Sequence, residues 1–461
     1  MSLTSTKTHS ARRISLKTPP GPKNPLSSTL AFQRTPLAFL SSLRQQYGDI
    51  AQFRLLTMPV VVISHPDYVQ QVLQKKYTNY DKDVFLFNVS RSFLGNGLVT
   101  AVGGESWLRQ RRLMQPAFHR QRITAMGQVM TDTTLKMLEH WQVCTNQDQT
   151  LDIEEEMMRL TLQIAGLVLF TMDVSGTSHA FGQAYAQVNT ALTDFLRFPL
   201  IPLSWPTSRG IRYRRAIRAM DKIAYDIIHR RRQSNEDAND LLSMLLQARD
   251  EETGEGMSDL QLRDEVMTLL FAGHETSAKA LTWTWYLLAK HPHVERKLHE
   301  ELGSVLEGRT PTIADLPRLP YARMILEESM RLYPPSWQVM RQAREEDEMG
   351  GYRIPAHTII FWSQYIVHRH PDFWENPEQF DPERFSPEQG QKRHSCAYIP
   401  FSSGPRMCIG NALALTEMHL ILATIAQRYR LALVPDNTSV EPIPLITLHP
   451  GRFRMRLEPA K

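Results

Sequence analysis

Ten residues near the C-terminus, 401–410, combine two glycines and a proline with a single cysteine, Cys408. The glycines and the proline predict a tight loop, and residues 411–420 carry apolar side chains at helical spacing. Cys408 is therefore expected where a rigid loop meets the N-terminus of a helix. Backbone N–H groups and the helix dipole favour a thiolate over a thiol at such a position. A thiolate there is a good axial ligand for haem iron, because its electron donation promotes cleavage of the O–O bond.

The spacing within this loop is Phe-x-x-Gly-x-Arg-x-Cys-x-Gly, from Phe401 to Gly410, and it resembles the haem-binding signature of the cytochrome P450 monooxygenases. A lone cysteine is more often a small buried hydrophobic residue, but the other specified positions argue against that interpretation. The resemblance runs from Pro-Pro-Gly-Pro at 19–22 to the segment 444–450. It implies an α+β fold, mainly α with small β-sheets. Haem b would lie between a long oxygen-binding helix and the helix after the cysteine loop.

The composition is that of a large globular protein. The 461 residues are 42% hydrophobic and 22% charged, so the chain can bury a large core. No linker, charge block or internal repeat marks a place to divide it. We expect a flexible N-terminal segment with a proline hinge at 1–30 and one haem-thiolate domain at 31–461.

Cysteine usage and charge indicate where the protein works. Three cysteines, Cys144, Cys396 and Cys408, are too few for a disulfide framework and indicate a reducing compartment. Residues 1–30 contain no apolar stretch as long as a membrane span or a signal-peptide core, so we expect a soluble, cytoplasmic protein. The net charge of +5 comes without a basic array interleaved with aromatics, so no nucleic-acid partner is expected.

One extended helix is predicted from Ser258 to the proline at 292, because Ser258 can cap it and no proline interrupts it. Within it, Gly273 would let a flat ligand approach the backbone. Thr276 can bond to a carbonyl one turn earlier and bend the helix. Glu275 can relay protons from solvent. Taken alone, these residues fit a packing kink and a solvated face equally well.

The segment Ala-Gly-x-Glu-Thr, from Ala272 to Thr276, resembles the oxygen-activating segment of the P450 family. The resemblance implies that Ala272 and Gly273 lie against haem and that Thr276 stabilises bound dioxygen. Glu275 would help to deliver the protons that release water. His274 is expected to face away from the cofactor.

A pair of charges three residues apart, Glu328 and Arg331, shares a face of a predicted helix and can form an ion pair. Such a pair on a surface would be worth only a few tenths of a kcal/mol. Arg384 follows in a proline-bounded loop, and the three together resemble the family's Glu-Arg-Arg triad. The resemblance assigns them to folding and haem retention rather than to chemistry.

Haem carries two carboxylates that need cationic or hydrogen-bonding partners. Trp107 and Arg111 lie one turn apart on a predicted helix and resemble the family's Trp-x-x-x-Arg element, in which both reach the propionates. Arg406 and Arg341 are further candidates, and Phe401 opens the cofactor-binding loop. Other exposed arginines are expected to form a docking patch for an acidic electron donor, and these are Arg109, Arg112 and Arg120.

Apolar segments suggest the substrate pocket. The stretch 83–87 is predicted as an apolar loop over the distal face of haem, with Phe85 and Phe87 in it. Phe195 and Phe198 are expected to form a second wall, and residues after a Pro-Pro break, Trp337 and Val339, to approach the edge of haem. Such aromatic stripes are more often core than pocket. A pocket of this kind would suit a fatty acid, a terpenoid or a polyketide-like molecule.

The leading hypothesis is a monooxygenase that inserts one atom of O₂ into an apolar substrate by hydroxylation or epoxidation. We expect a monomer that receives electrons from a ferredoxin or flavodoxin and its reductase, because no flavin domain follows residue 461. A peroxide-driven peroxygenase is one alternative, although such relatives tend to lose the Glu275–Thr276 pair. A haem-based gas sensor and a zinc site at His394, Cys396, Cys408 and His419 are the others, and the zinc spacing matches no common pattern.

Overall fold

The computed structural model describes residues 16–147, 149–172, 175–197, 202–234, 240–249, 254–434 and 440–460. Its α-helices are α1 (Pro25–Arg34), α2 (Pro36–Tyr47), α3 (Pro66–Gln70), α4 (Phe85–Leu94), α5 (Gly104–Met114), α6 (Arg120–Asn146), α7 (Ile153–Phe170), α8 (Ser175–Arg197), α9 (Ser208–Ser234), α10 (Leu241–Gln247), α11 (Asp259–Lys290), α12 (Pro292–Leu306), α13 (Pro320–Leu332), α14 (Gln364–Val367), α15 (Pro387–Gly390) and α16 (Asn411–Ala426). Its strands are β1 (Ile50–Leu55), β2 (Met58–Ile63), β3 (Tyr80–Asp81), β4 (Thr150–Asp152), β5 (Val339–Ala343), β6 (Asp347–Met349), β7 (Tyr352–Ile354), β8 (Ile359–Trp362), β9 (Tyr429–Leu433), β10 (Ile443–Pro444), β11 (Leu448–His449) and β12 (Arg454–Pro459).

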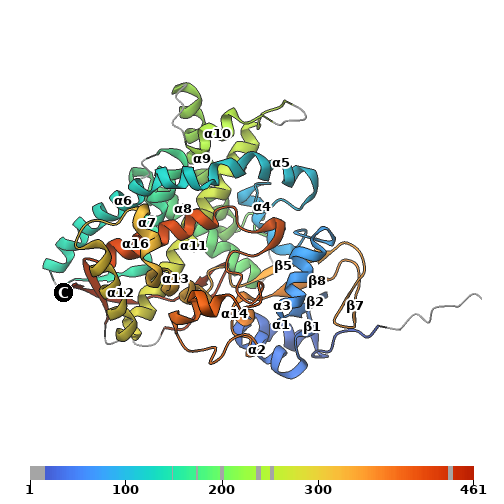
Figure 1. Cartoon of the computed structure of the whole chain (residues 1–461). Coiled ribbons are helices and arrows are strands. Elements are labelled where there is room, and N and C mark those ends of the chain that lie inside the picture. Colours follow the sequence, from blue (N-terminus) through green and yellow to red (C-terminus); the bar gives the residue numbers. More distant parts are fainter. Residues whose placement is uncertain are drawn as a thin grey trace, which may run out of the picture.

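Helix α11 is the axis of a large helical region, and α7, α9, α13 and α16 pack against it. Figure 1 shows these helices gathered on one side and β1, β2, β5 and β8 on the other. At the N-terminus of α11, the Ser258 hydroxyl accepts a hydrogen bond from the Gln261 N–H at 3.2 Å. The C-terminal end of α11 is followed by the proline that begins α12. The predicted single helix and the α+β fold class are confirmed.

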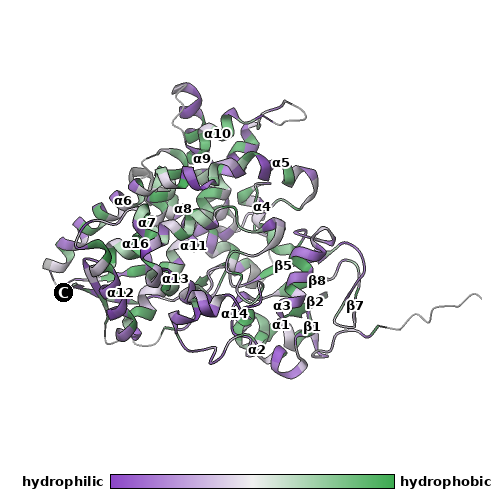
Figure 2. Ribbon diagram, in the orientation of Figure 1, coloured by the Kyte–Doolittle hydropathy of each residue, from purple (hydrophilic) through white to green (hydrophobic). Residues whose placement is uncertain are grey.

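The five-stranded sheet has the order β1-β2-β8-β5-β3. Strands β2 and β8 are parallel, and the other pairs are antiparallel. Alternate residues of β2 enter different cores: Val61 and Ile63 pack in one and Val60 and Val62 in the other. Both faces of the sheet are therefore covered, and Figure 2 shows green, apolar segments in the interior and purple ones on the outer helices.

The N-terminal part of the described chain is held against the sheet. Gln52 N–H donates to the Pro20 carbonyl at 2.8 Å, and Lys17 forms a parallel bridge with Tyr352. The expected boundary at residue 30 falls inside α1, whose N-cap is Asn24. Backbone hydrogen bonds to β1 and β7 hold Lys17 and Pro20 of this segment in place. Within the described ranges, no helix has both the length and the apolar character that crossing a membrane requires.

The apolar stretch expected to be a loop is mostly a helix, α4. Phe85, Val89 and Phe93 recur every four residues, as on one face of a helix, and Gly95 follows as the C-cap with φ 62°. The loop after α4 then sits on α11. A Cβ on Gly97 would lie 2.1 Å from the Thr268 hydroxyl, so only glycine fits there.

Candidate active site

Cys408 lies where the sequence predicts it, between a 3₁₀ turn at Gly404–Arg406 and the first residue of α16. Its N–H donates to the Phe401 carbonyl at 2.9 Å, which closes the loop. Gly404 has φ 70°, and a Cβ there would lie 2.1 Å from the Leu73 carbonyl oxygen. The signature glycine is thus required by the close approach of a neighbouring backbone.

Cys408 is exposed by solvent-accessible area, although many protein atoms lie around its sulfur. Burial raises the pKa of the thiol, and this effect outweighs the Gly410 N–H and the charges of Arg111 and Lys82, which lower it. Burial therefore acts against the N–H groups and dipole of the helix N-terminus, and the thiolate state of Cys408 stays a prediction. A bound metal would deprotonate a coordinating thiol outright.

Four cationic side chains gather near Cys408. They are Lys82, Arg111, Arg341 and Arg406, which donate to the carbonyl oxygens of Val99, Met407, Met340 and Ala101 at 2.8, 2.9, 2.7 and 3.1 Å. Burial and then the other cations lower the pKa of Arg341 to about 9 and that of Lys82 well below its usual value. Asp81, the acid whose charge acts on Arg341, is paired with Arg344 at 2.9 Å. Buried cations of this kind fit a ligand that brings its own carboxylates.

Trp107 completes this group, because the Arg406 guanidinium lies over its ring at 4.2 Å from the centroid. Trp107 and Arg111 both lie on α5, as predicted. The sequence interpretation missed Lys82. Its signal was weak, because a lysine beside an aspartate is ordinarily a solvated residue.

The middle of α11 is less buried than the rest of the helix interior. Residues 271–273 and Thr276 are half-buried, whereas 262–270, 274, 275 and 277–288 are buried. The Thr276 hydroxyl donates to the Ala272 carbonyl at 2.8 Å, as the sequence predicts. A Cβ on Gly273 would make ordinary van der Waals contact with Leu169 and Ala165 of α7, at 3.7 and 3.8 Å. The approach of a flat ligand to the backbone at Gly273 stays a prediction.

Glu275 is 1% exposed, so the alternative of a solvated face is wrong. Its carboxylate accepts hydrogen bonds from the Tyr185 hydroxyl, from Thr447 Oγ1 at 2.9 Å and from Asn189 Nδ2 at 3.3 Å. His274 is buried on the α8 side, with its ring 5.0 Å from that of Tyr185. The hydroxyl of the next residue, Ser277, donates to Glu417 of α16 at 3.0 Å, a second buried acid that the sequence did not indicate.

The three residues of the ionic network come together. Arg331 donates to both oxygens of Glu328, at 2.6 and 2.8 Å, and both side chains are fully buried. Arg384 Nε lies 3.5 Å from Glu328 Oε1. Arg331 also donates to the carbonyl of Pro377 at 2.7 Å, so the network fixes the loop after α14 to α13.

The candidate pocket residues divide into two groups. Phe85 of α4 and Phe195 of α8 form a ring pair with centroids 5.8 Å apart, and the Phe87 ring lies 5.1 Å from Lys82 Nζ. Val339 is half-buried on β5. Trp337 is 2% exposed and donates to the Leu445 carbonyl at 2.8 Å, so it is a core anchor rather than an open wall. Phe198 lies outside the described residues.

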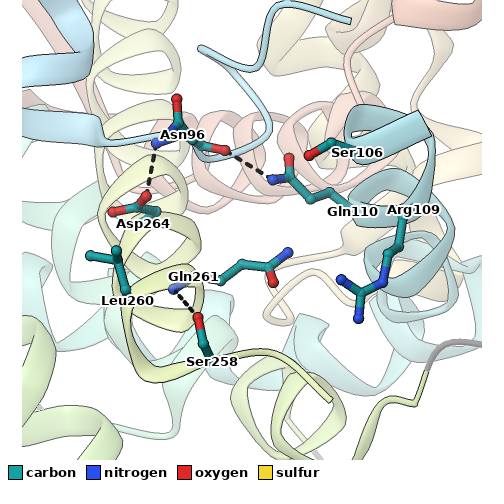
Figure 3. Close-up of a pocket in the computed structure, with 8 residues that line it drawn as sticks. All are labelled: Asn96, Ser106, Arg109, Gln110, Ser258, Leu260, Gln261 and Asp264. Atoms are coloured by element: carbon teal, nitrogen blue, oxygen red, sulfur yellow. Dashed lines mark hydrogen bonds between the residues drawn. The ribbon is translucent and has the colours of Figure 1, made fainter. Parts of the chain in front are cut away.

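Arg109 does not point outward with the other candidates for a docking patch. Its guanidinium donates to the Glu255 carbonyl at 3.3 Å and lines a small polar pocket between α5 and the start of α11 (Figure 3). Asn96 spans the same pocket, because its N–H donates to Asp264 at 2.8 Å and its carbonyl accepts from Gln110 at 2.9 Å. Arg112 and Arg120 are exposed.

The zinc alternative fails on geometry. His394 pairs with Asp67 at 3.1 Å, and His419 Nε2 lies 3.0 Å from the Leu319 carbonyl oxygen. Among the described residues no group of three or more His, Cys, Asp or Glu side chains is arranged to hold a metal ion.

This fold, with a cysteine loop before one helix and a threonine-bearing helix packed against it, defines a haem-thiolate enzyme. The family model for cytochrome P450 matches residues 19–457. The chain is 39% identical to cyclooctat-9-en-7-ol 5-monooxygenase of Streptomyces melanosporofaciens, over 91% of this chain and 90% of that protein. It is 33% identical to pentalenene oxygenase of Streptomyces avermitilis, over 95% and 96% of the two chains. The crystal structure of the haem domain of cytochrome P450DA superposes with a TM-score of 0.89, at 28% identity, over 97% of this chain and 98% of that one.

The chain therefore belongs to the cytochrome P450 family. It is a monooxygenase that binds haem b and uses electrons from redox partners to insert one atom of O₂ into an apolar organic substrate. The residues present fit that cofactor, since four cations that form no ion pair within the described ranges lie near the Cys408 sulfur. The family assignment favours this activity over the peroxygenase and gas-sensor alternatives.

Proposed function

We propose that the substrate is a polycyclic terpene hydrocarbon or alcohol. The observation that carries the proposal is the 39% and 33% identity, over nearly the whole chain, to enzymes named for cyclooctat-9-en-7-ol and pentalenene. The Phe85–Phe195 ring pair supports it, because neither ring offers a charged group to a carboxylate. A fatty acid would leave its carboxylate unpaired against such a wall.

The roles of the site residues are part of the proposal. Cys408, in the loop that Phe401 opens, would bind the haem iron. Trp107 and the four cations would hold the cofactor's carboxylates, and Ala272 would contact the cofactor. Haem b supplies the activation of O₂ when it is bound. Thr276 presents its hydroxyl on the half-buried face of α11, and Glu275 supplies it with protons. Glu328, Arg331 and Arg384 keep the proximal loops in place.

The partner and the setting follow the same reasoning. An acidic ferredoxin or flavodoxin would dock on the exposed Arg112 and Arg120, and the protein would act as a cytoplasmic monomer. The free state of Cys144, Cys396 and Cys408 supports a reducing compartment. We propose a single haem-thiolate domain over the described chain after the proline segment.

Titration of the purified ferric enzyme tests the substrate class. Polycyclic terpenes and their alcohols should displace water from the iron and shift the Soret band to shorter wavelength. A linear fatty acid with the same number of carbons serves as the matched comparison. Tighter binding of the fatty acid than of every terpene tried would overturn the proposal. Product analysis with a ferredoxin and its reductase then identifies the oxidised carbon.

A further inference from the structure

The acid of the oxygen helix is one end of a chain of charged groups that leads toward solvent. His449 Nε2 lies 3.3 Å from Glu275 Oε1, and His449 Nδ1 lies 3.1 Å from Glu154 Oε1. Lys279 of α11 pairs with the same Glu154. The side chains become more exposed along the series: Glu275 is 1% exposed, His449 16% and Glu154 19%. The imidazole is thus the link between a fully buried carboxylate and a partly solvated one.

The two contacts of the imidazole differ in quality. Nδ1 forms a hydrogen bond with Glu154, whereas Nε2 is buried and makes only an unaligned ion-pair contact with Glu275. The oxygens of Glu275 are already engaged by Tyr185 of α8 and by Thr447, the residue before β11. The carboxylate is therefore held apart from the Thr276 hydroxyl, which bonds within its own helix.

We propose that His449 is a positioning residue that stores a proton and supplies it to Glu275, with Glu154 as the solvent-side partner. The Nε2–H bond breaks as an O–H bond forms on Glu275 Oε1, and Glu275 passes its proton on toward Thr276. The neutral imidazole keeps its Nδ1 proton. It regains a proton from water after a half-turn of the ring exchanges the two nitrogens. This inference rests on the role proposed for Glu275 and extends it to a residue outside α11.

The charges around the imidazole support storage on His449 rather than on Glu275. Burial alone would raise the pKa of Glu275, but the contact with His449 and the charge of Lys279 outweigh it and bring that pKa to about 2. Burial lowers the pKa of His449, and Glu154 and Glu275 outweigh that effect, so the pKa of His449 is raised despite Lys279. Tyr185 on α8 and His274 on α11 also face Glu275, and burial raises the pKa of the first and lowers that of the second. At rest His449 is an imidazolium and Glu275 a carboxylate. His449 therefore carries the extra proton at pH values below its own pKa.

The first experiment is the pH profile of coupling, the product formed per O₂ consumed, for any substrate that turns over. Coupling in the wild type should fall as pH rises through the pKa of His449, by roughly tenfold per pH unit where proton supply limits. His449→Gln retains a hydrogen-bonding side chain but stores no proton, so its profile should be low and flat over that range. Glu154→Gln should move the midpoint to lower pH without flattening the curve. A structural role alone would lower all values equally and leave the midpoint unchanged, which would overturn the proposal.

His291→Gln is the matched control, because this half-buried imidazole lies 2.7 Å from the Leu287 carbonyl oxygen and forms no ion pair with an acid in the described part of the chain. Its profile should match the wild type. The second readout does not depend on turnover. It is an NMR pH titration of the His449 ring in the ferrous carbon monoxide form, and the His449 signal is identified by its loss in His449→Gln. A His449 pKa above 6.5 in the wild type that falls in Glu154→Gln would support the proposal that His449 stores a proton. A wild-type value at or below 6.5 would overturn that proposal. If terpenes failed to bind, both readouts could still be interpreted. The proposal of a terpene substrate and the proposal for His449 can therefore be refuted independently.

Discussion

At the scale of single residues, Lys82 shows most clearly how this protein uses buried charge. Its ammonium donates to a main-chain carbonyl, and burial and three arginines lower its pKa. Without an anion such an arrangement is repulsive, so the interaction that stabilises it must come from a ligand. Cofactor binding and protein stability are thus coupled at one nitrogen atom.

Lys82→Met should have opposite effects on the two forms of the protein. The apoprotein should gain roughly 1–3 kcal/mol of unfolding free energy, because a buried cation is replaced by an apolar side chain of similar length. The haem-loaded protein should lose its cofactor faster. Denaturant unfolding of the apoprotein and transfer of haem to apomyoglobin measure the two effects. Lys75→Met removes an exposed lysine nearby and should change neither.

At the scale of elements, the loop between α4 and α5 is attached to α11 at several points. Asn96 N–H bonds to Asp264 at 2.8 Å, and Leu98 N–H donates to Glu265 at 3.0 Å. This attachment depends on Gly97, whose missing side chain faces the Thr268 hydroxyl and the Asp264 carbonyl. The position of Phe85 and Phe87 over the site therefore depends on a glycine outside the pocket.

Gly97→Ala should destabilise the protein by about 2 kcal/mol or more, because the methyl group would force the loop off α11. Thermal unfolding followed by circular dichroism measures this, with haem content checked in parallel. Gly303→Ala in α12 is the control, since nothing lies within 4 Å of its Cβ position. A helix-interior alanine there should stabilise by up to about 1 kcal/mol. Equal behaviour of the two variants would refute the packing argument.

On helix α5, Arg112 is exposed, whereas Arg109 lines the pocket beside α11. The structure thus distinguishes two arginines that were expected from sequence to belong to the same docking patch. Reversing charge at Arg112 and Arg120 should slow reduction by an acidic ferredoxin about tenfold at low salt, and high salt should erase most of the difference. Stopped-flow reduction of the ferric enzyme measures it. Arg296→Glu, at an exposed site on α12, should leave the rate unaltered if docking is local.

Several elements were predictable from sequence because their signals are local. The extent of α11 follows from a serine cap and the spacing of prolines, and the Glu328–Arg331 pair follows from helical geometry. What the sequence could not show concerns tertiary relations. The position of a Cβ on Gly273 faces α7 at van der Waals distance, and burial opposes the effect of the helix N-terminus on Cys408. Neither the neighbour of a glycine nor the burial of a thiol is encoded within one helical turn.

At the scale of the whole molecule, two buried acids make stability depend on pH. Burial raises the pKa of Glu265 and of Glu417 to about 8. Between about pH 4.3, where an unfolded glutamate titrates, and about pH 8, these two side chains bind more protons in the folded chain than in the unfolded chain. The unfolding free energy contributed by these groups is therefore complete below that window and falls as pH rises, by about 1.4 kcal/mol per pH unit for each. Above the window it is constant.

Glu417→Gln should remove the contribution of Glu417 to the decrease of unfolding free energy with rising pH. The variant should gain stability relative to the wild type as pH rises from 5 to 8, and the two should converge toward acid pH. Urea unfolding at several pH values measures the difference. Glu300→Gln replaces an exposed glutamate and should show the wild-type dependence. Parallel curves for Glu417→Gln and the wild type would mean that Glu417 is ionised when folded.

The cluster of four cations has a consequence for how cells make this protein. A newly synthesised chain that has not met haem carries mutually repelling charges in its interior, and it should open locally there more often than the mature enzyme. Proteases act on such open forms, so the cellular level of the enzyme should follow the supply of porphyrin rather than the level of its messenger. Feeding a haem precursor during expression should then raise the yield without raising synthesis.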